Sequence, residues 1–141
     1  MPASRRTKII IWAIVSVIAI GIAWFAYGFY CAWHKFASEE RICSAFHPVF
    51  GAIDKFYDTT GALPTNLTQL VPVYIPQIPT APVADSVDYR IMSDGTNWQI
   101  TVRSRITGAP RVFVQRSSHK FTDDERRQSV TGFHDWVVFR E

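Results

Sequence analysis

The sequence predicts an α+β protein in which an apolar N-terminal helix precedes a small antiparallel sheet. An uncharged run extends from Ile9 to Trp33, a helical apolar pattern follows it, and the apolar period changes to two from Val87 onward. Helix and strand patterns in separate parts of one chain are typical of the α+β class. A chain of 141 residues has room for one such domain beside a membrane anchor.

The excess positive charge is concentrated at the beginning of the chain. Arg5, Arg6 and Lys8 precede the uncharged run, and no acidic residue accompanies them. The remaining 12 lysines and arginines (15 minus 3) are balanced by 12 aspartates and glutamates. The later part of the chain therefore lacks the clustered positive field that nucleic-acid binding requires. We expect no nucleic acid among the partners of this protein.

The uncharged run has the length and composition of a transmembrane helix. About 20 helical residues cross a hydrocarbon core of about 30 Å, and apolar side chains occupy every face of this segment. Basic residues before a span favour a cytoplasmic N-terminus. We therefore expect a basic cytoplasmic segment (1–8), a transmembrane helix (9–33) in the lipid bilayer of a bacterial inner membrane, and a periplasmic domain (34–141). Aromatic residues, which favour the headgroup region, are concentrated at the second end of the span: Trp24, Phe25, Tyr27, Phe29, Tyr30 and Trp33.

A cleaved signal peptide is the alternative interpretation of the same segment. Such a peptide has a basic start, an apolar run of about 7–15 residues and small residues before the cut. Ala26 and Gly28 satisfy the last condition, but the run is longer and bulky aromatic residues flank this position. An uncleaved anchor explains the segment better. Gly21 and Gly28 also lie on one helix face, where small residues would let a second helix approach.

The pattern over 34–58 predicts a helix that continues the first one. Apolar residues recur at steps of three, four and seven, as at Phe46, Val49 and Ile53. Pro48 lacks an amide hydrogen, so we expect it to kink or break the helix. Gly61 is a natural stop.

The segment 62–82 is rich in proline, and within it we expect a short helix from Thr65 or Asn66 to Val71. The apolar loop 74–79 that follows is expected to pack against the domain.

Alternating apolar residues predict three or four antiparallel strands after this loop. The segments 87–91 and 98–102 are joined by Asp94-Gly95, a hairpin signal. Arg111–Arg116 gives a third strand and Phe133–Arg140 a last one. With the helix covering one face of the sheet, these elements complete the α+β domain.

No pattern in the sequence makes a convincing catalytic, cofactor or metal site. The histidines and cysteines lack metal-ligand spacing, and the nucleotide-binding glycine patterns are absent. Asp123 and Asp124 could bind Ca²⁺ through oxygen ligands, but Thr122 and Glu125 have the spacing of a capping box. A helix start explains the acidic cluster more simply. We expect no enzyme activity, no cofactor and no metal.

Two further residue pairs have a structural explanation. Asp54 and Asp58 lie four apart, as expected for the solvated face of a helix. Cys31 and Cys43 would be about 18 Å apart on one helix, whereas a disulfide needs Cα atoms within about 7 Å. We expect both to be free within one chain, with a crosslink between two chains as the alternative.

The order of the elements resembles that of type IV pilin-like proteins, especially the pseudopilins of type II secretion. The segment from Ala52 to Thr65 is similar to the end of a pilin helix and its glycine–proline turn. Residues 67–79 are similar to the stretch that leads to the pilin sheet, and 89–98 to its first hairpin. The similarity covers roughly 42–103, and the anchor matches in kind.

The pilin processing motif is absent. A pilin precursor has a leader ending in glycine, followed by Phe or Met and by a glutamate at the fifth mature position. Ala26 and Trp33 stand at that position after Gly21 and Gly28. No calcium site is carried over from the pseudopilins.

The resemblance implies a structural or assembly protein. It would be a single-pass membrane-anchored subunit acting through contacts with other membrane or periplasmic subunits, copies of itself included, as in a pilus or a type II secretion-like system. We consider 117–132 and 64–82 candidate contact surfaces. The alternative is a non-polymerising accessory or scaffold subunit of another membrane complex. A third hypothesis is an enzyme or ligand-binding module that uses His119, Asp123, Asp124 or His134, which could converge in space if the last strand lies near the polar loop.

Overall fold

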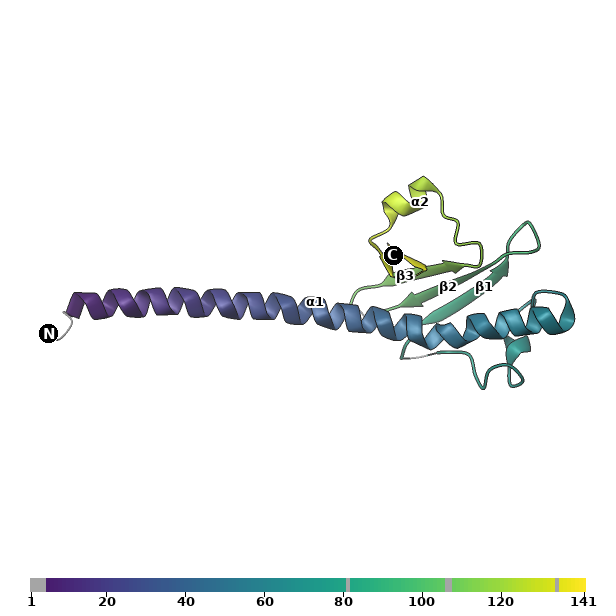
Figure 1. The fold of residues 1–141 in the computed structure, drawn as a ribbon, viewed down its shortest axis with the longest axis horizontal. Coiled ribbons are helices and arrows are strands. Elements are labelled where there is room, and N and C mark those ends of the chain that lie inside the picture. The colour runs from purple at the N-terminus through teal and green to yellow at the C-terminus, as the bar shows by residue number, and fades with distance from the viewer. Residues whose placement is uncertain (1–4, 81, 106–107, 134) are drawn as a thin grey trace. The chain divides into compact units, whose positions relative to one another are not determined.

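Helix α1 (Arg5–Thr60) is the longest element of the computed structural model, which describes residues 5–80, 82–105, 108–133 and 135–141 (Figure 1). The chain divides into two units, Met1–Phe36 and Ala37–Glu141. The first unit holds the apolar part of α1, and the second holds the rest of α1 and an antiparallel sheet. The predicted α+β class is confirmed.

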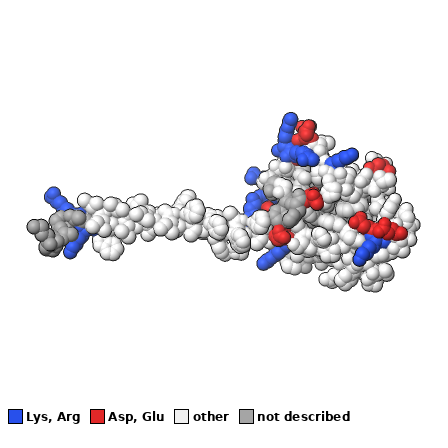
Figure 2. All heavy atoms as spheres, in the orientation of Figure 1, with Lys and Arg blue, Asp and Glu red and all other residues white. Residues whose placement is uncertain are grey.

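The first unit has no buried side chain among its described residues. All positions from Lys8 to Phe36 are exposed, including Trp24 at 81% and Ile18 at 55%. After the basic residues at its beginning, the sequence of this unit carries no charge until Lys35, and Figure 2 shows a long stretch without acidic or basic side chains. By length and composition, this helix can cross a membrane.

In the second unit, α1 has one buried face. Ile42, Phe46, Val49 and Ile53 follow one another at steps of four, three and four and are all buried. We expected a kink or a break at Pro48. The helix continues through this residue, so the break is wrong. Phe46 and Val49 are buried on both sides of the proline, and this packing outweighs the loss of one backbone hydrogen bond.

The sheet has five antiparallel strands in the order β1-β2-β3-β5-β4. The register places Val102 opposite Phe113, and Phe113 opposite Val138, so these side chains lie on one face. The strands are β1 (Ser86–Ile91), β2 (Trp98–Ser104), β3 (Arg111–Arg116), β4 (Thr131–Phe133) and β5 (Trp136–Arg140).

The last predicted strand is two strands in the structure. Phe133 belongs to β4, which pairs with β5 through Thr131–Val138 and Phe133–Trp136. The sheet therefore has five strands rather than three or four. The pattern predicts one strand because the sequence between Phe133 and Trp136 contains neither glycine nor proline. His134 itself lies outside the described residues.

The predicted hairpin joins β1 to β2. Two backbone amides, those of Thr96 and Asn97, donate hydrogen bonds of 3.0 and 2.9 Å to Asp94 Oδ1. Together with the bond from the Asn97 side chain, they hold the pKa of Asp94 below its ordinary value. Gly95 has φ +71°, a conformation that favours glycine.

One face of the sheet packs against α1 to form the core. Side chains of the proline-rich segment complete it: Leu67 and Leu70 of the short helix η1 (Leu67–Leu70), and Ile75 after it. The expected helix in this segment is thus a single 3₁₀ turn, and the loop that follows does pack. The helix α1 ends beside Gly61, whose amide bonds to the Tyr57 carbonyl at 2.8 Å.

The short helix α2 (Asp123–Gln128) begins with the predicted capping box. Thr122 accepts a hydrogen bond from the Glu125 amide at 3.2 Å, and Glu125 Oε2 accepts one from the Thr122 amide at 2.8 Å. Arg116 on β3 donates to both carboxylate oxygens of Glu125, at 2.6 and 3.0 Å. These bonds lower the pKa of Glu125 to about 2, with the Arg116 bond as the largest cause.

Candidate functional site

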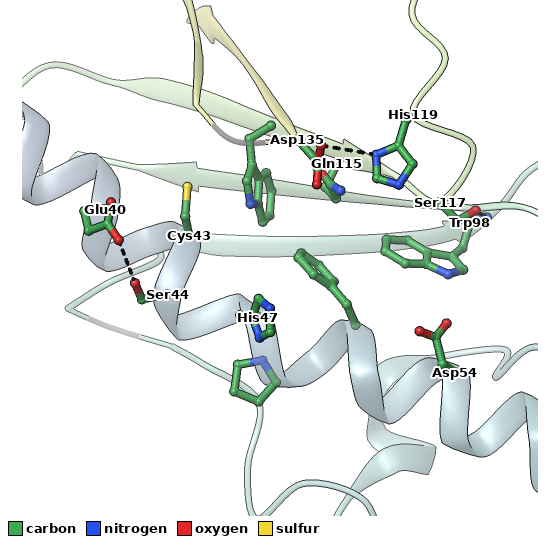
Figure 3. A pocket seen from close by; sticks show the side chains of 13 residues that line it. Glu40, Cys43, Ser44, His47, Asp54, Trp98, Gln115, Ser117, His119 and Asp135 are labelled. Carbon is green, nitrogen blue, oxygen red and sulfur yellow. Dashed lines mark hydrogen bonds and ion pairs between the residues drawn. The ribbon is translucent and has the colours of Figure 1, made fainter.

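A cleft of about 680 Å³ lies between α1 and one end of the sheet (Figure 3). Its volume is in the usual range for ligand pockets, roughly 300–1,000 Å³. The helix side is formed by Glu40, Cys43, Ser44, His47, Phe50 and Asp54, and the sheet side by Trp98, Gln115, Ser117, His119, Asp135 and Trp136.

The helix side of the cleft is long. Glu40, Ser44 and His47 lie at steps of four and three, which places them along one helix face. Figure 3 shows Glu40 and Asp54 at opposite ends of this side. At a rise of 1.5 Å per residue they are separated by about 21 Å along the helix axis. The cleft therefore suits an extended ligand better than a compact one.

Aromatic rings form the middle of the cleft. Phe50 stacks on Trp98 with 5.4 Å between ring centroids, and its ring is 5.6 Å from that of Trp136. Phe46, which is not among the lining residues, packs edge-on against Trp136 at 6.1 Å between ring centroids. Both tryptophans are buried. Because each ring is held by another, the aromatic wall is fixed before any ligand enters.

Gln115 is a buried polar side chain in the wall of the cleft. It is 4% exposed, and its Oε1 has no hydrogen-bond partner among the described residues. The register pairs Gln115 with Ile100, so its side chain shares the face of the sheet that packs against α1. A buried acceptor without a partner costs about 1–3 kcal/mol. This unsatisfied group is what distinguishes the cleft from an ordinary gap between helix and sheet.

The charged groups around the cleft are acidic or histidine. His119 Nδ1 lies 3.7 Å from Asp135 Oδ1, and both side chains are more than half exposed. Glu40 accepts a hydrogen bond from Ser44 at 3.4 Å, and Asp54 is exposed at the far end of the helix side. No lysine or arginine is among the described residues that line the cleft. The lining therefore carries acidic side chains without a lysine or arginine of its own.

The structure separates the residues that a converging site would need. His119 lines the cleft, whereas Asp123 and Asp124 begin α2 and are not among its lining residues. Asp124 lies 3.9 Å from Arg127 on the same helix. His134 lies outside the described residues. Within the described part of the chain, no group of three or more His, Cys, Asp and Glu side chains is placed to hold a metal.

Sequence reasoning did not find the aromatic wall or Gln115. The strand pattern contains a signal for Gln115, because it follows Phe113 by two residues and so shares its buried face. A polar residue at an apolar register position indicates a buried polar group. Asp135 could not be placed because the turn between β4 and β5 was not predicted.

The two cysteines are free, as expected, and differ in exposure. Cys43 lines the cleft but is 6% exposed. Burial, with smaller contributions from Glu40 and Glu39, raises the pKa of its thiol to about 12. Cys43 is therefore an inert thiol, and Cys31 is the exposed one.

Comparisons with the models of known protein families, with curated proteins and with solved structures found no match to this chain. A long apolar N-terminal helix and a small antiparallel sheet are compatible with a pilin-like fold at that coarse level.

Proposed function

We propose that this protein is a single-pass membrane-anchored, pilin-like structural or assembly subunit that acts through contacts with other subunits. The observation that carries the proposal is the exposure of the apolar part of α1. Apolar side chains cover all its faces, and none of those described is buried by the rest of the chain. Apolar surface exposed to water is unfavourable by roughly 25 cal/mol per Å². Lipid or neighbouring helices around this stretch would remove that cost.

Charge and aromatic residues support one orientation. Arg5, Arg6 and Lys8 precede the span, and the positive-inside rule favours the cytoplasm for them. The aromatic residues at the other end suit the opposite headgroup region. In a bacterial inner membrane, the unit Ala37–Glu141 would then be periplasmic.

Two glycines favour contact with a second helix. Gly21 and Gly28 lie seven residues apart, and an added Cβ at either would meet no heavy atom within 4 Å. The described chain therefore gives no packing reason for a small residue at either position. Close approach of a neighbouring transmembrane helix would give one.

A non-polymerising accessory or scaffold subunit is the second candidate. It is favoured by the absence of the pilin processing motif, since Ala26 and Trp33 replace the expected glutamate. In this version the partner is a different protein, and the type II secretion-like or pilus assignment does not apply.

Photo-crosslinking in native membranes tests the proposal and separates its two versions. A benzophenone amino acid would replace Phe25 in the span or Val73 in the domain, which are 79% and 78% exposed. Two differently tagged copies of the chain would be expressed together. Adducts that contain both tags indicate self-assembly, and adducts with other membrane proteins indicate an accessory subunit. Absence of adducts from both positions, with the chain retained in the membrane, would contradict a function through subunit contacts.

A further inference from the structure

We infer that the cleft between α1 and the sheet binds a basic, extended segment of a partner protein through its arginine or lysine side chains. The inference rests on the proposed function and names the chemistry of the partner. The cleft is defined by its aromatic wall (Phe50, Trp98, Trp136), its buried amide (Gln115) and its rim carboxylates (Asp54, Asp135).

The charge and the rings of the cleft select a cation. Asp54 and Asp135 stand on opposite sides of the opening, from α1 and from the turn between β4 and β5 (Figure 3). Trp98 and Trp136 are buried and packed against Phe50, so the partly exposed Phe50 is the ring of the aromatic wall that offers surface to a cation. Aromatic rings attract ammonium and guanidinium groups, with a strength that grows when water is excluded. Since the described lining contains carboxylates and no lysine or arginine, its formal charge favours a cationic ligand over an anionic one.

Gln115 adds a requirement for a hydrogen-bond donor. Its Oε1 is unpaired and shielded from solvent. Rotation of the side chain toward the cleft would bring this oxygen within reach of a ligand that carries hydrogen-bond donors. Guanidinium and ammonium groups carry several donors and no acceptor. Either group could therefore supply the hydrogen-bond donor that Gln115 Oε1 lacks.

The length of the cleft favours a polypeptide over a small cation. About 21 Å along α1 corresponds to roughly six residues of extended chain at about 3.3 Å each. Ser44 and Ser117 lie on opposite sides and donate their own hydroxyl hydrogens to Glu40 and Asn97, so their oxygens can accept hydrogen bonds from the amides of a peptide backbone. A segment with basic side chains at both ends would reach the separated carboxylates Glu40 and Asp54 (Figure 3).

The test is fluorescence polarisation with the full chain in micelles of an uncharged detergent. The probe is a fluorescein-labelled peptide of alternating glycine and arginine with three arginines. Its control carries citrulline in place of arginine, which keeps the shape and removes the charge. We expect saturable binding of the arginine peptide and binding of the citrulline peptide at least about tenfold weaker.

Variants locate the binding within the cleft. Gln115→Leu should weaken the arginine peptide about tenfold without lowering the thermal unfolding temperature, because it removes an unpaired buried acceptor. Asp54→Asn combined with Asp135→Asn should weaken it by at least as much. Asp58→Asn is the matched control, since Asp58 is exposed on α1 one turn beyond Asp54 and does not line the cleft. It should leave affinity unchanged within about twofold.

Several outcomes would overturn the inference. Two concern the peptides: the arginine peptide does not bind saturably, or the citrulline peptide binds equally well. A third is unchanged affinity in the Gln115 and aspartate variants. A fourth is displacement of the arginine peptide by an equal concentration of spermidine, because a small cation would then bind as well as the peptide. Dissociation of a dimer of this chain by the peptide would also overturn it, because the occupant would be a second copy. If the peptide does not bind but the chain still crosslinks to partners, this inference is refuted and the proposed function stands. If the peptide binds but no crosslink forms, the proposed function is refuted.

Discussion

Helix α1 contains two stretches that use the same residue types for opposite purposes. In the first, Val17 is 70% exposed and Phe25 79%. In the second, Val49 is 1% exposed and Phe46 is fully buried. The difference lies in their neighbours: the first stretch is apolar on all faces, whereas polar residues separate the apolar positions of the second. Composition alone thus indicates whether a helix needs lipid or a sheet as its partner.

The first stretch should lose its membrane association when charge is placed at its centre. The double variant Ile14→Asp/Ile18→Asp would cost about 5–7 kcal/mol of insertion free energy, at about 2.5–3.5 kcal/mol per charge. We expect most of the chain to be released by alkaline carbonate. The control is the double variant Lys55→Asp/Thr59→Asp, at two exposed positions of the second stretch that are also four residues apart. It should leave membrane retention unchanged. Retention of the Ile14/Ile18 variant would contradict an anchoring role.

The second stretch should respond in the opposite way. Phe46→Ala removes a buried ring that packs on Trp136 and would lower the free energy of unfolding by about 3–5 kcal/mol. Urea unfolding of the chain in micelles measures this loss. Tyr57→Ala, at a position 45% exposed on the same helix, should cost less than about 1 kcal/mol. Carbonate retention should not change, and a loss of retention would mean that the two stretches are not independent.

The cysteines give a chemical version of the same comparison. A rise of the Cys43 pKa from near 9 to about 12 leaves roughly a thousandth of the usual thiolate at pH 8. Cys31 lies two residues before the end of the span, among the aromatic residues of the headgroup region, where a membrane-permeant maleimide can reach it. We expect one label on the folded chain and two after denaturation. Cys31→Ser should abolish the single label, and Cys43→Ser should retain it. Two labels in the folded state would show that Cys43 is accessible.

The smallest expected effect concerns α2, within the folded unit. Glu125 has a pKa near 2, below its ordinary value of 4.5, so its contribution is present above pH 4.5 and is lost as pH falls toward 2. Glu125→Gln should reduce stability by about 1–2 kcal/mol at pH 7, a value limited by the partial exposure of the pair. The difference from the parent should vanish near pH 2. Asp124→Asn, at a largely exposed position, should change stability by less than about 0.5 kcal/mol at either pH.

The sequence was sufficient for the elements whose patterns are long or chemically marked. The uncharged run, the Asp94-Gly95 turn and the Thr122–Glu125 capping box each depend on neighbouring residues, and each formed as predicted. The break at Pro48 was wrong because burial on both sides of the proline is a tertiary effect. The division into β4 and β5 escaped notice because their turn lacks a breaker residue.

The cleft could not be predicted in the same way. Gln115, Trp98 and Asp54 belong to three elements and meet only through the packing of α1 on the sheet. A single sequence carries the spacing within an element but not the register between elements. The buried position of Gln115 could have been anticipated once its strand was aligned with Phe113, but not its unpaired oxygen.

The most direct test of a permanent membrane anchor is the intact mass and N-terminal sequence of the chain that remains in native membranes after an alkaline carbonate wash. The account predicts a retained chain that still contains residues 1–33 ahead of the folded unit. Recovery of the chain in the wash, or of a product that begins after Gly21 or Gly28, would contradict an uncleaved anchor.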